Sequence, residues 1–206
     1  MAQKEWFGRS CRFARLLDYL SPSSSPLRSL GNEIVYAGGL AHRKNEFLYK
    51  WEPSKGGYAV NLYGTGFDDS LPYDSNGINL CGFVKADSLI HDAKGSFGLV
   101  WDGDSLDECS GSFGEYLRLN NPHKASLYIR CGLPVLIWSN AALCEFITSS
   151  GIGIAIDSLE DIPRILSEMS REKYTIMAEN VRKMSEKISQ GYFLKQALSN
   201  AISLLR

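Results

Sequence analysis

Five consecutive residues, Asn120-Asn121-Pro122-His123-Lys124, carry side chains suited to holding an anion. The asparagines can donate or accept hydrogen bonds, and proline is favourable in a first helical turn, so the segment predicts the start of a helix. His123 and Lys124 would then lie in that first turn, where a cation opposes the helix dipole. A phosphate bound at the same helix start would make Lys124 favourable. The alternative, that Lys124 points into water at a small cost, stays open.

Glycine turns after apolar runs are a second candidate for ligand contact. Gly38-Gly39 ends the first run, and the basic pair Arg43 and Lys44 follows within reach of a diphosphate. The same residues can equally form a tight turn and a solvated helix start. Tyr63 ends another run, so it can stack on a base or a sugar, or it can pack beneath the loops.

An acidic cluster at Asp102-Gly103-Asp104, with Asp107 and Glu108 close by, suggests a divalent cation bound against a nucleotide diphosphate. Aspartate and glycine are also common in solvated turns, and we favour that interpretation. The sequence has no GxGxxG segment after its first apolar run and no GxxxxGK[ST] segment. The sequence therefore lacks the motifs that are typical of dinucleotide-dependent dehydrogenases and P-loop enzymes, and both classes are disfavoured.

Short apolar runs that alternate with helical patterns must position these residues. Strands that are apolar throughout are typical of a parallel sheet covered on both faces, so we predict a doubly wound α/β, Rossmann-like domain. Ligands in such sheets bind at the carboxyl ends of the strands. The predicted strands are 33–39, 58–66, 78–84, 97–104, 133–139 and 151–157. The predicted helices are 87–94, 122–131, 141–149, 159–169, 172–189 and 192–205.

The first thirty residues differ from the remainder. Apolar residues at helical spacing between Phe13 and Leu20 predict a short helix, and the SPSSSP stretch over 21–26 predicts a linker. We therefore divide the chain into an N-terminal segment with linker, 1–30, and a domain over 31–206.

Composition excludes several classes of protein. The 206 residues include 22 Lys and Arg against 23 Asp and Glu, and 44% are hydrophobic, so disorder and a dedicated nucleic-acid binder are disfavoured. No segment has the length and apolarity of a membrane-spanning helix, and the N-terminus lacks the apolar core of a secretion signal. The five cysteines show no zinc or disulfide spacing, which indicates a cytoplasmic protein without a structural metal.

Several strings resemble the bacterial glucosyltransferase 3-like and galactofuranosyltransferase family. They are IVYAGGL at 34–40, INLCGFV at 78–84, FGLVWDGDS at 97–105, the long string from Cys109 to Ser139, and GIGIAIDSLEDI at 151–162. The resemblance implies a GT-B fold, of which this chain matches the C-terminal, donor-binding domain. Residues 1–30 would be a remnant of the connection to an acceptor-binding domain that we expect to be absent from this sequence. The final helix, 192–205, would cross back toward that domain.

The resemblance also implies roles for individual residues. Gly38, Gly39, Arg43 and Lys44 would face the diphosphate of a nucleotide-sugar donor, although the family often has asparagine at the position of Gly39. The asparagine pair, His123 and Lys124 would lie on the phosphate and sugar side, with Lys124 stabilising the leaving group. Tyr116 would help to shape the same pocket. Asp102 matches a family position, but GT-B enzymes generally need no metal, so the resemblance implies no metal and no cofactor beyond the donor.

Two functions follow as hypotheses. The first is a glycosyltransferase donor domain that binds a UDP-linked sugar for hexosyl transfer to a surface polysaccharide or glycoprotein, and that is inactive alone. The second is a non-catalytic binding or partner module, associating with a separate acceptor domain or with itself. A metal-dependent transferase that uses Asp102 and Asp104 is a weaker third. The sequence names neither the sugar, the acceptor nor a general base.

Overall fold

The computed structural model describes residues 16–204, and its centre is a six-stranded sheet in which all neighbouring strands are parallel. The strands are β1 (Glu33–Gly39), β2 (Ala59–Thr65), β3 (Ile78–Gly82), β4 (Phe97–Val100), β5 (Val135–Trp138) and β6 (Gly153–Ile156). Their order is β3-β2-β1-β4-β5-β6, so the direction of winding reverses between β1 and β4. The predicted doubly wound α/β fold is confirmed.

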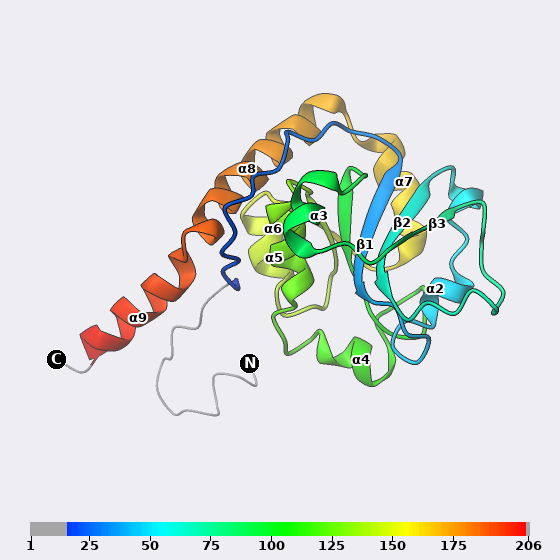
Figure 1. Ribbon diagram of the computed structural model, residues 1–206, viewed down its shortest axis with the longest axis horizontal. Coiled ribbons are helices and arrows are strands. Elements are labelled where there is room, and N and C mark those ends of the chain that lie inside the picture. Colours follow the sequence, from blue (N-terminus) through cyan, green and yellow to red (C-terminus); the bar gives the residue numbers. More distant parts are fainter. Residues whose placement is uncertain (1–15, 205–206) are drawn as a thin grey trace.

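Helices cover both faces of this sheet (Figure 1). On one side lie α3 (Ala86–Asp92), α5 (His123–Arg130) and α6 (Cys144–Ser149), with α8 (Arg171–Ser189) packed against α5. On the other side lie α2 (Phe47–Lys50) and α7 (Ile162–Glu168). The remaining elements are α4 (Gly111–Tyr116), α9 (Tyr192–Leu204) and the 3-10 turns η1 (Pro53–Gly56) and η2 (Leu159–Asp161).

The apolar runs form strands because the two covered faces bury the side chains of the central strands most completely. Every residue of β4 and β5 is buried, whereas β3, at the edge of the sheet, is largely exposed. The sequence pattern did not predict α2 or α4, which are four and six residues long. Such short helices lack the repeated apolar spacing on which a helix prediction depends.

The N-terminal residues 16–30, here called the strap, form no helix. The predicted helix up to Leu20 is therefore wrong over residues 16–20, and Phe13 lies outside the described residues. Nor is the SPSSSP stretch a free linker, since the buried guanidinium of Arg130 on α5 donates hydrogen bonds to the carbonyl oxygens of Ser21 and Ser23. Arg28 donates in turn to carbonyl groups at the ends of α3 and α5, so the strap is part of the domain.

The strap also fixes the junction between α8 and α9. The chain turns there at Gly191, whose φ of 72° favours glycine. The Asp18 carboxylate accepts hydrogen bonds from the backbone N–H groups of Phe193 and Leu194, at 3.1 and 2.6 Å, and so caps the start of α9. From this point α9 projects away from the sheet (Figure 1). No helix within residues 16–204 has the length and apolarity needed to cross a membrane.

Candidate functional site

The carboxyl ends of β1 and β4 lie side by side at the point where the winding reverses, which is the usual ligand position in this architecture. Asp102 follows β4, Lys44 and Asn45 follow β1, and Lys124 lies in the first turn of α5. Asn45, Asp102 and Lys124 contact Tyr36, a buried residue of β1, and Lys44 joins them through Asp102. We call these five residues the switch-point cluster.

The hydroxyl group of Tyr36 is the centre of the switch-point cluster. Its oxygen lies 2.6 Å from Asn45 Oδ1, 2.8 Å from Asp102 Oδ1 and 3.0 Å from the carbonyl oxygen of Trp101. Lys124 Nζ donates to the same hydroxyl oxygen at 3.0 Å and sits 4.4 Å from the centre of the Tyr36 ring. One side chain therefore contacts three separate segments of the chain.

Lys124 is an interior cation. Its side chain is 9% exposed, and its ammonium donates to Asp102 Oδ1 at 2.8 Å and to the carbonyl oxygen of Trp101 at 3.3 Å. Burial lowers the pKa of Lys124, while the Asp102 carboxylate acts in the opposite direction. The alternative that Lys124 points into water is therefore wrong, and its contacts offset the unfavourable position of a cation at a helix start.

Asp102 is shared between two lysines. Its side chain is 7% exposed, and Lys44 Nζ lies 3.6 Å from the same oxygen that Lys124 contacts. The Lys44 side chain is 30% exposed, so it is the cation of this cluster with the freer access to solvent. Two ammonium groups against one carboxylate leave a formal charge of +1 at the ends of β1 and β4, which favours an anion there.

Asn120 and Asn121 come directly before α5 and have unused hydrogen-bonding capacity. Within the described residues, the Oδ1 atoms of both side chains are buried without a hydrogen-bond partner. Such a group costs free energy unless water or a ligand satisfies it. The helix itself begins at His123, and Pro122, its N-cap residue, makes no side-chain hydrogen bond to its N-terminus. This end of α5 thus presents unpaired polar groups next to Lys124.

The glycine turn Gly38-Gly39 leaves open space beside these groups. A Cβ atom built on either glycine would meet nothing within 4 Å, so no neighbouring atom of the chain excludes a side chain there. Gly38 has a φ of 143°, a conformation that favours glycine, whereas Gly39 shows no such restriction. The carbonyl oxygen of Gly39 accepts a hydrogen bond from Asn45 Nδ2 at 2.6 Å, which links this turn to the switch-point cluster.

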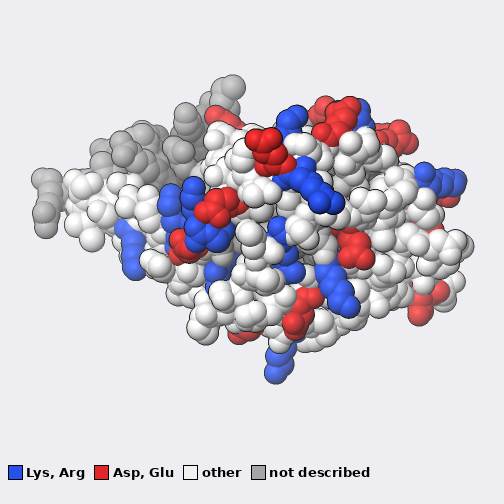
Figure 2. All heavy atoms as spheres, turned by 90° about the horizontal axis from the view of Figure 1, so that it is seen from above, with Lys and Arg blue, Asp and Glu red and all other residues white. Residues whose placement is uncertain are grey.

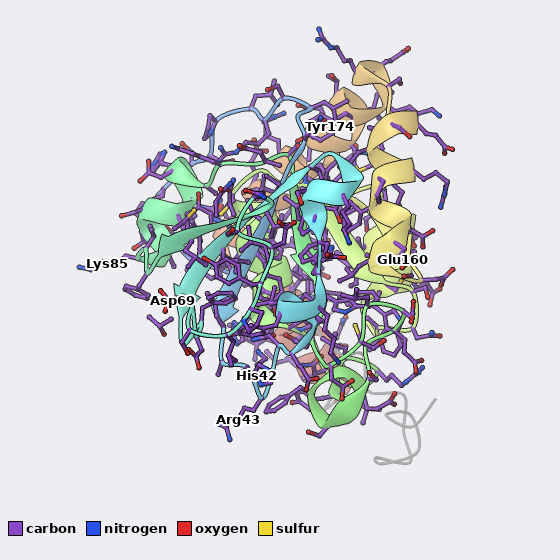
Figure 3. All side chains as sticks on the ribbon, turned by 90° about the vertical axis from the view of Figure 1, so that its right-hand side faces the viewer. His42, Arg43, Asp69, Lys85, Glu160 and Tyr174 are labelled. Atoms are coloured by element: carbon purple, nitrogen blue, oxygen red, sulfur yellow. The ribbon has the colours of Figure 1, made fainter. Side chains whose placement is uncertain are left out.

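Four candidate residues belong neither to the cluster nor to the asparagine pair and glycine turn described above. Arg43 lies at the tip of its loop and points away from the body, next to His42 (Figure 3). Tyr116, on α4, and His123 are exposed. The expectation that Tyr63 stacks on a base or a sugar is not met. Its ring is buried, and its hydroxyl accepts a hydrogen bond from the Lys94 backbone N–H, beyond the C-terminus of α3.

The two aspartates considered for a metal face different partners. Asp102 pairs with lysines inside the switch-point cluster, whereas Asp104 is exposed and accepts a hydrogen bond from Ser110 Oγ. Among residues 16–204, no three His, Cys, Asp or Glu side chains are placed to hold a metal ion together. Asp102 is thus engaged as the counter-ion of Lys124, which does not suit a metal ligand.

The sequence pattern missed Tyr36 and Asn45. Both are fully buried, and buried tyrosine hydroxyl and asparagine amide groups need partners. A tyrosine within an otherwise aliphatic run is the one available signal.

Away from the site, the face seen from above in Figure 2, over α8 and the amino ends of the strands, mixes basic and acidic side chains without a basic stripe.

Comparison with known sequences identifies relatives. The sequence model of the glucosyltransferase 3-like, C-terminal domain family matches residues 34–201. The chain is 35% identical over 196 residues to the β-1,6-galactofuranosyltransferase WbbI of Escherichia coli (strain K12), covering 93% of this chain and 57% of that protein. It is 36% identical over 126 residues to glucosyltransferase 3 of Streptococcus gordonii, covering 61% and 37%. The chain thus spans about half, or less, of the relatives it matches.

Solved structures share the fold at low sequence identity. WaaG, a glycosyltransferase involved in lipopolysaccharide biosynthesis, superposes with a TM-score of 0.53 at 17% identity, covering 83% of this chain and 47% of WaaG. HepE of Anabaena, solved in complex with UDP-glucose, superposes with a TM-score of 0.54 at 12% identity, covering 84% and 49%. At these identities the likeness concerns the fold alone.

Proposed function

Because this chain belongs to the glucosyltransferase 3-like, C-terminal domain family, we propose that it is the donor-binding domain of a glycosyltransferase. Its ligand is a nucleoside-diphosphate sugar, UDP-linked, whose diphosphate lies at the carboxyl ends of β1 and β4. The full reaction transfers a hexosyl group to a surface polysaccharide or glycoprotein. The names of two relatives, a galactofuranosyltransferase and a glucosyltransferase, support hexosyl transfer but differ in the sugar.

One observation carries this proposal: Lys44 and Lys124 meet at the strand ends beside the start of α5 and the open glycine turn. Transfer of the sugar leaves a nucleoside diphosphate, whose growing negative charge must be stabilised. Two ammonium groups and the positive end of a helix provide that stabilisation without a metal ion. The unpaired Oδ1 atoms of Asn120 and Asn121 are acceptors, so they suit the hydroxyl groups of the sugar.

The remaining parts of the reaction lie beyond this chain. No residue of the switch-point cluster is placed as a general base for an acceptor hydroxyl, so we propose that a separate acceptor-binding domain supplies it. By itself the chain would bind the nucleotide and catalyse sugar transfer poorly.

The described cysteines are unpaired, which is consistent with a cytoplasmic location, where disulfides are rare.

Calorimetric titration of the chain with UDP tests this proposal. We expect saturable binding that Lys44→Met weakens by about tenfold, the effect of losing one charge-assisted hydrogen bond. Lys55→Met is the matched control. Lys55 is an exposed lysine on η1, outside the cluster, and it forms an ion pair with Glu52. Affinity that survives EDTA would remove the metal-dependent alternative. Absence of UDP binding by a folded chain would refute the donor-site proposal.

A second candidate function rests on the surface of α9. Leu194, Leu198 and Ile202 follow one another at four-residue spacing on this helix and are 57%, 54% and 55% exposed. Three exposed apolar residues on one helical face favour contact with a partner. A non-catalytic module would use this face to bind a separate acceptor domain or a second copy. Heat-flat titrations together with self-association in sedimentation would favour that function over donor binding.

A further inference from the structure

We propose that Tyr36 is a positioning residue of the donor site, whose hydroxyl holds the β1–α2 loop, the end of β4 and the start of α5 in one arrangement. This inference rests on the proposed function, since it concerns the site where the diphosphate would lie. Tyr36 itself is fully buried and cannot reach a ligand in solvent. It acts through Lys124 and through Asn45, which is the neighbour of Lys44 in the chain.

The directions of the hydrogen bonds around Tyr36 are mutually consistent. Asn45 Nδ2 donates to the carbonyl oxygen of Gly39, which turns Asn45 Oδ1 toward the Tyr36 hydroxyl as an acceptor. Asp102 Oδ1 and the Trp101 carbonyl oxygen are also acceptors. The hydroxyl has one proton, which it donates to one of these three acceptors at a time, while its oxygen accepts a hydrogen bond from the Lys124 ammonium.

The hydroxyl remains a donor because of its surroundings. Burial, and then the negative charge of Asp102, raise the pKa of Tyr36 well above its ordinary value. At neutral pH the group is thus protonated and neutral, and it adds no charge to the cluster. It fixes the positions of charged neighbours without changing the net charge that a diphosphate would meet.

Core packing explains the ring of Tyr36 but not its oxygen atom. The ring packs edge-on against Phe47 at 5.5 Å between centroids, and phenylalanine would fill the same space. The oxygen instead lies within hydrogen-bonding distance of four groups that belong to the end of β4, the β1–α2 loop and α5. It joins the two segments that carry Lys44 and Lys124, so its loss would leave the two cations linked through the Asp102 carboxylate without this second connection.

Tyr174 offers a matched control for removing this oxygen. It is also buried, on α8, and its hydroxyl donates one hydrogen bond to the carbonyl oxygen of Ser96, at the amino end of β4. Tyr36→Phe and Tyr174→Phe each remove one buried oxygen and leave an aromatic ring in place. A merely structural role predicts the same behaviour for both variants, whereas a positioning role predicts a difference in the site.

The experiment combines hydrogen exchange of the ligand-free chain with UDP titration. We expect Tyr36→Phe to speed amide exchange in the 41–46 loop and in the first turn of α5, and to lower UDP affinity about tenfold. Tyr174→Phe should change neither measurement in the site. In a Lys124→Met background, Tyr36→Phe should weaken binding by a smaller factor, because part of its effect passes through that ammonium.

The outcomes separate this inference from the proposed function. Unchanged exchange and unchanged UDP affinity in Tyr36→Phe would overturn the positioning role while leaving donor binding intact. A wild-type chain that does not bind UDP would overturn the donor site and the positioning role in it. Faster exchange in Tyr36→Phe would then show only that its hydroxyl couples the 41–46 loop to the start of α5. If Tyr36→Phe does not fold, Asn45→Ala serves instead, with the same expected weakening of UDP binding.

Discussion

Lys124→Met should destabilise the chain and abolish most of its UDP binding, and the two effects can be separated. The substitution removes the ammonium but retains an unbranched side chain of similar length. It leaves the Asp102 carboxylate, which is 7% exposed, without its partner at 2.8 Å. Loss of one member of a buried ion pair costs about 3–5 kcal/mol.

The surroundings of Asp102 reduce this penalty. Tyr36 OH remains 2.8 Å from the carboxylate oxygen and Lys44 Nζ remains 3.6 Å away, so the charge is not left isolated. We therefore expect Lys124→Met to lower the free energy of unfolding by about 2–3 kcal/mol, below the usual range. Adding Asp102→Asn removes the unpaired charge, and the double variant should lie only about 1 kcal/mol below the wild type.

Urea unfolding at pH 7 and UDP titration give the assay, and both are applied to the wild type, Lys124→Met, Asp102→Asn and the double variant. Stability should recover in Asp102→Asn/Lys124→Met, but UDP affinity should stay at least tenfold below that of the wild type, because no ammonium is restored. Additive stability losses in the double variant would refute the ion-pair reasoning. Recovered UDP affinity would show that Lys124 serves only to neutralise Asp102.

Two further predictions concern the remainder of the fold. Burial raises the pKa of Tyr58 to about 12 from an ordinary 10.0, so the folded chain keeps this proton where the unfolded chain loses it, and stability falls as pH rises above 10. Between pH 10 and 12, Tyr58→Phe should remove up to about 1.4 kcal/mol per pH unit of this loss of stability. The measurement is the urea midpoint at alkaline pH relative to that at pH 8, and an equal fall in the wild type and in Tyr58→Phe would contradict the prediction. Asp18→Ala, which removes two hydrogen bonds from the start of α9, should cost about 1–2 kcal/mol in urea unfolding and reduce helical circular dichroism. Asp18→Asn should retain part of this capping. Identical stability of Asp18→Ala and the wild type would show that the capping does not stabilise the fold.

The sequence by itself determined the strands, the longer helices and the edge of the sheet where the site lies. Strands buried on both faces must be apolar, and six apolar runs predict the six strands, of which β3 at the edge of the sheet is largely exposed. Proline and the polar residues before α5 likewise placed Lys124 in its first turn. These are local properties, and neighbouring residues in the chain are enough to specify them.

The tertiary structure alone decided which groups meet. Tyr36 and Lys124 are 88 positions apart in the sequence, and they come within hydrogen-bonding distance because β1 pairs with β4 and α5 packs against β4. The packing of α5 against β4 places Lys124 beside Asp102, and packing also places the Tyr63 ring beneath the chain that follows α3. The SPSSSP stretch over 21–26, predicted as a linker, is held against the domain because the buried guanidinium of Arg130 donates hydrogen bonds to the carbonyl groups of Ser21 and Ser23. The type of a residue determines which groups its side chain can bind. The distance between that side chain and its partner depends on how the whole chain between the two residues folds.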